Sequence, residues 1–157
     1  MRFLGLFCLV LGLLSHTNTS FASDSNVMMV AKVVQSGTTI SQVIFFNSKN
    51  VTSIEKCEEE KAHGLQFGWR EFNHVFNQKA GAGFSVLYQC VTSGVSMSRW
   101  GGRHARLNKI VYLVDIKAKV ATIELMPSYA KCIGKVRAIQ GEESRSLFCG
   151  SATQKIK

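Results

Sequence analysis

Four cysteines constrain this chain of 157 residues more than any other sequence feature. They are Cys57, Cys90, Cys132 and Cys149, and each lies far from the next one. The spacing forms neither a CxxC redox centre nor a clustered zinc knuckle, so we expect no metal site and no cofactor. An even number of separated cysteines in a small exported chain predicts two disulfide bonds.

The start of the chain indicates that it is exported. Arg2 precedes an unbroken apolar run from Phe3 to Leu14, which is shorter than the roughly 20 residues that cross a bilayer core. A short apolar run behind one positive residue, followed by small polar residues, is typical of a secretory signal peptide. The alternative, a membrane-anchoring helix, is disfavoured by this length.

The cleavage site divides the chain into two parts. Ser20-Phe21-Ala22 places small residues at the positions that signal peptidase reads. We therefore predict a signal peptide over residues 1–22, which would leave together with Cys8, and a single domain over residues 23–157. This mature domain is predicted to be periplasmic or secreted, without a transmembrane segment.

The chain is strongly basic. It has 19 Lys and Arg residues against 10 Asp and Glu residues, a formal net charge of +9. Because only Arg2 lies in the leader, residues 23–157 keep 18 basic against 10 acidic residues, a net of +8. Such an excess steers a protein toward an anionic surface or an acidic protein. Solubility alone is the competing explanation.

Hydrophobic patterns in the first half predict strands around a helix. The runs at 27–34 and 41–46 favour a β-hairpin, and residues 84–91 alternate as a further strand. Between them, Thr52 is the expected N-cap of a helix that runs to about His63 and ends at Gly64, with its glutamates facing water. A second helix over residues 66–78 is expected to align Trp69, Phe72 and Phe76 on one face.

The second half repeats most of this order. The runs at 109–116 and 120–126 predict another hairpin, and residues 146–149 predict a short closing strand. A helix between them is expected to begin at Ser128 and to end at Gly141.

We therefore predict an α+β fold, a mainly antiparallel sheet of about six strands with packed helices. The favoured arrangement is two ββαβ, ferredoxin-like units over residues 23–95 and 107–157, each stapled by a disulfide. Chance similarity of the two halves is the alternative, because their residue identity is slight.

The order of elements favours one disulfide pairing among the three that four cysteines allow. Each predicted helix carries one cysteine, and the strand that follows it carries another. A helix that packs on the following strand would join Cys57 to Cys90 and Cys132 to Cys149. The two other pairings stay open at this point.

A basic loop between the halves is the main candidate site. Residues 98–109, SRWGGRHARLNK, gather cations around Trp100, and two glycines allow a tight turn. Guanidinium groups pair well with carboxylates or phosphates, and an exposed indole offers a docking surface. In the alternative, the loop is a solvated connector with its indole against the core. The predicted partner-binding residues are Arg99, Trp100, Arg103, His104, Arg106 and Lys109.

These features favour a non-enzymatic binding protein, an exported inhibitor, adaptor or effector that engages an anionic surface or an acidic protein. No signature of DNA or RNA binding is present, which disfavours nucleic acid as the partner. The rival hypothesis is a small secreted hydrolase, such as a nuclease, that uses His63, His74 or His104 for acid–base chemistry. Because no nucleophile motif surrounds these histidines, we name no catalytic residue.

Overall fold

The computed structural model describes residues 26–38, 40–71, 83–100, 109–139 and 145–157. The predicted signal peptide, over residues 1–22, lies outside these ranges. The described residues form six strands and two helices, and neither helix is long and apolar enough to cross a membrane. Their bounds are β1 Asn26–Gln35, β2 Ser41–Phe46, α1 Ile54–Phe67, β3 Phe84–Ser93, β4 Ile110–Lys117, β5 Val120–Met126, α2 Tyr129–Ile139 and β6 Arg145–Ala152.

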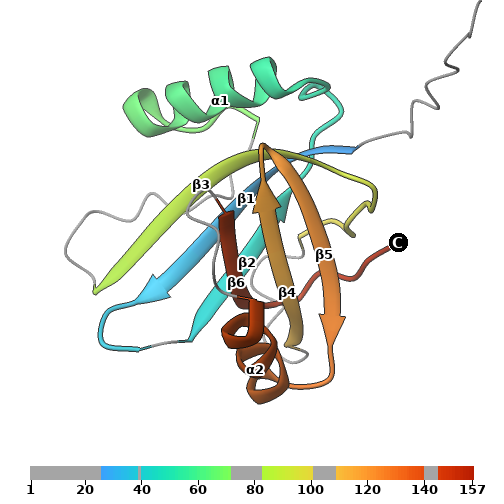
Figure 1. Ribbon diagram of the computed structural model, residues 1–157. Coiled ribbons are helices and arrows are strands. Elements are labelled where there is room, and N and C mark those ends of the chain that lie inside the picture. The colour runs from blue at the N-terminus through green and yellow to red at the C-terminus, as the bar shows by residue number, and fades with distance from the viewer. Residues whose placement is uncertain (1–25, 39, 72–82, 101–108, 140–144) are drawn as a thin grey trace, which may run out of the picture.

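The six strands close into one barrel in the order β1-β2-β6-β4-β5-β3, with α1 and α2 outside it on opposite sides (Figure 1). Within each half the pairs are antiparallel, β1 with β2 and β3, and β4 with β5 and β6. Two parallel pairs, β2 with β6 and β3 with β5, join the halves. The mixed α+β fold is confirmed.

The expectation of a mainly antiparallel sheet is wrong. Because β2 and β3 both run antiparallel to β1, they run parallel to one another, and the same holds for β5 and β6 around β4. When two such three-stranded sheets join at both edges in one barrel, both junctions must be of the same kind, and in this barrel both are parallel. The strands share one barrel, so two ferredoxin-like units lying side by side are not confirmed.

The same pairing register occurs in both halves. One residue of each central strand lies opposite one residue of the hairpin partner and one cysteine of the last strand. These sets are Met29 with Phe46 and Cys90 in the first half, and Leu113 with Glu124 and Cys149 in the second.

The two parallel junctions between the halves, which we call the seams, follow this correspondence. Gln42 pairs with Ser151 at one seam, and Thr92 pairs with Val120 at the other. In the sets above Phe46 corresponds to Glu124, so four residues earlier on each strand Gln42 corresponds to Val120. Cys90 corresponds to Cys149, so two residues later Thr92 corresponds to Ser151. The residue correspondence that matches one half of the barrel to the other therefore also matches one seam to the other.

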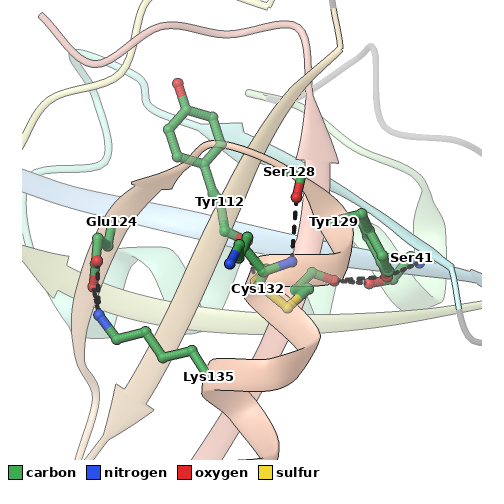
Figure 2. Close-up of a disulfide and its surroundings, with 9 residues drawn as sticks. Ser41, Tyr112, Glu124, Ser128, Tyr129, Cys132 and Lys135 are labelled. Carbon is green, nitrogen blue, oxygen red and sulfur yellow. Dashed lines mark hydrogen bonds and ion pairs between the residues drawn. A yellow bond between two sulfur atoms is a disulfide. The ribbon is translucent and has the colours of Figure 1, made fainter.

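Both helices begin at a serine that caps the first turn. The Ser53 side chain accepts a hydrogen bond from the Lys56 N–H at 3.3 Å, and the Ser128 side chain accepts one from the Lys131 N–H at 3.2 Å (Figure 2). The predicted cap at Ser128 is confirmed. The predicted cap at Thr52 is wrong, because Ser53 is the residue whose extended backbone and hydroxyl meet the helix start.

Helix α1 is longer than its sequence pattern suggests. It continues through Gly64 to Phe67 and ends at Gly68, whose φ of 100° suits only glycine. The predicted helix over residues 66–78 is therefore wrong at 68–71, which are not helical. Its remaining residues, Phe72 and Phe76 among them, lie outside the described residues, as does the predicted stop at Gly141.

Gly64 provides the space in which Trp69 packs. A Cβ at this position would clash with Cε3 of Trp69, whose ring packs at a tilt against that of Tyr88, with centroids 5.0 Å apart. We expect Gly64→Ala to lower the free energy of unfolding by about 1–3 kcal/mol in a urea titration, because the indole must move.

The matched control for this change is Gly134→Ala in α2. A Cβ there meets nothing within 4 Å, so the helix gains about 0.5–1 kcal/mol. Equal effects of the two substitutions would contradict the packing explanation.

The two disulfides are Cys57–Cys90 and Cys132–Cys149, the pairing that the order of elements favours. Each joins a helix to the strand that follows it. All four cysteines are buried, with Cα–Cα distances of 5.8 Å and 5.9 Å. The bridges therefore hold α1 and α2 against the outer face of the barrel, while the inner face is filled mainly by aliphatic and aromatic side chains.

Candidate functional site

The structure describes three of the six predicted partner-binding residues. Arg99 and Lys109 are exposed, whereas Trp100 is half-buried against the cluster under α1, with its ring 6.1 Å from that of Phe46. An indole held against the core is not the exposed docking surface that the sequence suggested. Arg103, His104 and Arg106 lie outside the described residues.

The end of the chain brings two further lysines to Arg99. Lys155 lies opposite Ser98, whose N–H donates to the Lys155 carbonyl at 2.7 Å, and the Lys157 N–H donates to the Ser96 carbonyl at 3.0 Å. An isolated bridge between Met97 and Ile156 lies between these two bonds. Arg99 directly follows Ser98, so it joins the same short two-stranded segment.

We call the exposed side chains of Arg99, Lys109, Lys155 and Lys157 the basic rim. Lys109 belongs to it because the next residue, Ile110, pairs with Ala152 just before the C-terminal segment. Sequence reasoning missed the two C-terminal lysines, since their place depends on a pairing between segments nearly sixty residues apart. Alternating lysines in the final KIK were the only local signal.

Gln154 fixes the rim to the barrel. Its side-chain carbonyl accepts from the Phe45 N–H at 2.8 Å, and its amide donates to the Phe45 and Ser98 carbonyls at 2.7 Å and 2.8 Å. The Gln154 carbonyl in turn accepts from the buried Tyr112 hydroxyl at 2.8 Å. A glutamine bonded in this way makes the rim part of the rigid sheet.

The two described acidic side chains of the second half, Asp115 and Glu124, are paired with cations outside the basic rim. Arg145 binds Asp115 through two nitrogens, and this donation holds the pKa of the Asp115 carboxyl below its ordinary value. Lys135 binds Glu124 at 2.6 Å (Figure 2). Among the described residues no acidic side chain forms an ion pair with the basic rim, so its positive charge is uncompensated there.

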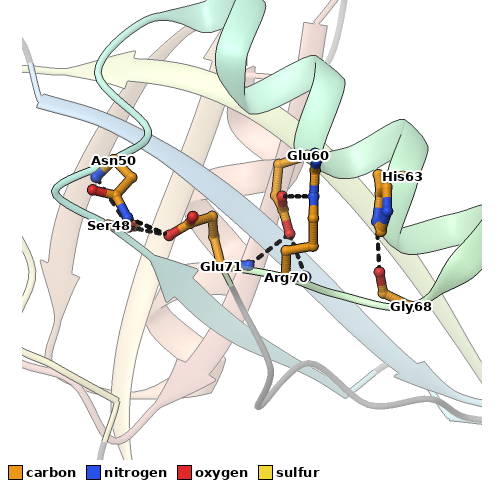
Figure 3. A network of polar contacts seen from close by, with 7 residues as sticks. All are labelled: Ser48, Asn50, Glu60, His63, Gly68, Arg70 and Glu71. Carbon is orange, nitrogen blue, oxygen red and sulfur yellow. Dashed lines mark hydrogen bonds and ion pairs between the residues drawn. The ribbon is translucent and has the colours of Figure 1, made fainter.

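A buried carboxylate organises the segment that follows α1. Glu60, only 2% exposed, accepts hydrogen bonds through one oxygen from the N–H groups of Arg70 and Glu71, both at 2.8 Å, and through the other from Arg70 Nε at 3.2 Å (Figure 3). The Glu71 carboxylate accepts from Ser48 and Asn50. The expectation that every glutamate of α1 faces water is therefore wrong for Glu60, whose role is structural.

His63 is engaged in a local contact. Its Nδ1 lies 2.8 Å from the Gly68 carbonyl oxygen, and its ring lies 5.4 Å from that of Phe67. This contact closes the end of α1. His74 and His104 lie outside the described residues, so the described ranges bring no second histidine to His63.

Comparison of the chain with protein-family models, with curated proteins and with solved structures finds no match.

Proposed function

We propose that this chain is an exported, disulfide-stabilised binding protein that engages an acidic protein or another anionic surface through the basic rim. In this proposal residues 1–22 are a signal peptide, and the two halves are ββαβ units joined in one barrel. Arg103, His104 and Arg106 belong to this proposal from the sequence alone, since they lie outside the described residues.

One observation carries the proposal, namely that four exposed cations lie on adjoining backbone segments at the end of the barrel, without acidic partners among the described residues. A backbone that is already held in place loses little conformational freedom on binding, so more of the attraction of its cations is converted into affinity and specificity. Attraction between exposed charges is screened by salt, which makes the binding measurable as a salt-dependent interaction.

The experiment compares two variants with the same change in net charge. The rim variant carries Arg99→Glu, Lys155→Glu and Lys157→Glu, whereas the control carries Lys56→Glu, Lys131→Glu and Arg137→Glu on the exposed faces of α1 and α2. The probe is poly-L-glutamate, titrated at low and at physiological salt.

We expect the rim variant to lose roughly tenfold or more in affinity at low salt, and the control to lose about threefold or less. Equal losses would show that net charge alone, and not the rim, binds the anion. Binding that ignores salt would also overturn the proposal.

A further inference from the structure

The outer edge of β3 is closed by a neighbouring strand only at its C-terminal end. Among the described residues β3 meets β5 at Thr92, whose N–H donates to the Lys119 carbonyl at 2.8 Å. Backbone groups of alternate residues point to the same side of a strand. The N–H and C=O groups of Tyr88 and Cys90 therefore point to the edge that faces away from β1, where no described strand pairs with them.

The corresponding edge in the second half is closed by side chains. The carbonyl of Cys149 accepts hydrogen bonds from the Ser41 hydroxyl and from the Tyr129 hydroxyl, the latter at 3.3 Å. The Tyr129 oxygen also accepts from the Ser41 N–H at 2.9 Å (Figure 2). The hydroxyl groups of Ser41 and Tyr129 therefore fill the gap at the edge of β6, and we call this pair of hydroxyls the plug.

The correspondence between the halves identifies the residues that stand in these places beside β3. Cys90 corresponds to Cys149, and the strand register places Lys119 where Ser41 stands. The caps Ser53 and Ser128 align the helices, which places Ile54 where Tyr129 stands. The first half consequently lacks both hydroxyls of the plug.

A half-open cavity of about 280 Å³ lies at this position in the first half. We call it the β3 groove. It runs from α1 across the edge of β3 to the turn between β4 and β5 and to the start of β6. Its lining includes the side chains of Glu58, Lys61 and Lys119 and the β3 residues Tyr88 and Cys90.

The charge of the groove is also specific to the first half. Glu58 is bound by Lys61 and, at 3.3 Å, by Lys119, and donation from Lys61 holds the pKa of the Glu58 carboxyl below its ordinary value. Among the residues that line the groove the two lysines outnumber the one carboxylate, so the lining carries a net positive charge. Glu55, which lies outside the lining, also attracts Lys119. On α2 the positions of Glu58 and Lys61 are taken by Ile133 and Val136, which pack into the core.

The polar groups suit an extended chain. The Tyr88 side chain lines the groove, where its hydroxyl can donate a hydrogen bond, and burial raises the pKa of that hydroxyl. The backbone groups of Tyr88 and Cys90 are spaced as a strand partner requires. Phe84 and Leu87, 41% and 55% exposed, extend the same strand away from the groove and offer apolar contacts.

We propose that the β3 groove binds an extended acidic peptide segment of a partner protein by strand addition to the edge of β3. The backbone of the segment would bond Tyr88 and Cys90, and one carboxylate would bind Lys119 and Lys61 in competition with Glu58. The site is separate from the basic rim and does not depend on it, so either proposal can fail alone.

The first measurement is amide hydrogen exchange by NMR. In the unliganded protein we expect the amides of Gln89 and Val91, which bond to β1, to exchange slowly, and those of Tyr88 and Cys90 to exchange clearly faster than these two. Addition of the peptide acetyl-Thr-Val-Glu-Val-Thr-amide should protect Tyr88 and Cys90, whereas the same peptide with lysine in place of glutamate should not. Slow exchange of Tyr88 and Cys90 before addition would overturn the proposal, because the edge would already be paired.

The second measurement transfers the plug of the second half to the first. Ile54→Tyr with Lys119→Ser introduces the two hydroxyl groups at the corresponding positions of the first half and should reduce affinity for the glutamate peptide roughly tenfold or more. Lys49→Ser, a surface lysine outside the groove, is the control and should leave affinity unchanged.

Lys119→Glu keeps the groove open and reverses one charge, so it should shift the preference from the glutamate peptide to the lysine peptide. This variant covers the case in which the double variant does not fold, which its thermal unfolding curve would reveal. Unchanged peptide preference in Lys119→Glu, or unchanged affinity in a folded double variant, would overturn the proposal.

Discussion

Replacing Glu60 by alanine lowers the free energy of unfolding by about 3 kcal/mol, with a larger effect than any surface substitution on the same helix. The carboxylate is buried and accepts three hydrogen bonds, two from backbone N–H groups and one from Arg70 Nε. Alanine leaves these donors without a partner and opens a space under α1. Urea titration measures the change as a shift of the midpoint at constant slope.

A glutamine at this position separates the two contributions. One oxygen of Glu60 receives both backbone N–H groups, so Glu60→Gln can keep those bonds and lose only the bond from Arg70, whose side chain is 57% exposed. We therefore expect a loss of about 1 kcal/mol for Glu60→Gln, since a pair with one exposed partner is partly screened.

Glu59→Ala, at the exposed neighbouring position, is the control and should change stability by less than about 0.5 kcal/mol. Equal effects of alanine at residues 59 and 60 would show that helix propensity, and not the buried network, is responsible.

Local patterns predicted the elements well where the structure depends on local order. The strands at 41–46 and 120–126 have the predicted bounds, because alternating apolar residues between turns are recognised within a few positions. The disulfide pairing also follows from order alone, since each helix packs on the strand that comes next.

Features that depend on distant segments were not predictable in the same way. The parallel seams arise from the way in which two three-stranded sheets meet, and no sequence pattern in β2 or β6 indicates that these strands pair. Glu60 has the sequence context of its exposed neighbours, and its burial follows from the return of Arg70 and Glu71 past the helix. Lys155 and Lys157 join Arg99 only through a bridge that the sequence does not mark.

The two halves share a pairing register but differ in the side chains at their seams. This difference supports the interpretation of the β3 groove as a binding site. A barrel with equal closure at both edges would need a serine and a tyrosine at residues 119 and 54, and the chain has Lys119 and Ile54 there. The second half therefore serves as an internal reference that shows what a closed edge looks like in this protein.

The two disulfides give the last and largest expected effect. In the chain-entropy account the bridge that closes the longer loop stabilises more, because it restricts the unfolded chain more. The sequence separations are 33 for Cys57–Cys90 and 17 for Cys132–Cys149. Replacing both cysteines by alanine should therefore lower the free energy of unfolding by about 4 kcal/mol for the first bridge and by about 3 kcal/mol for the second.

Comparing the two alanine pairs in urea tests the origin of this stabilisation. All four cysteines are similarly buried, so the cost of losing sulfur packing is similar for both bridges, and loop length is the main difference. If removal of Cys132–Cys149 cost clearly more than removal of Cys57–Cys90, the entropic account would be wrong for this protein. The alternative would then be that α2, a helix of 11 residues, depends on its bridge for docking, whereas α1 is also held by Trp69 and Glu60.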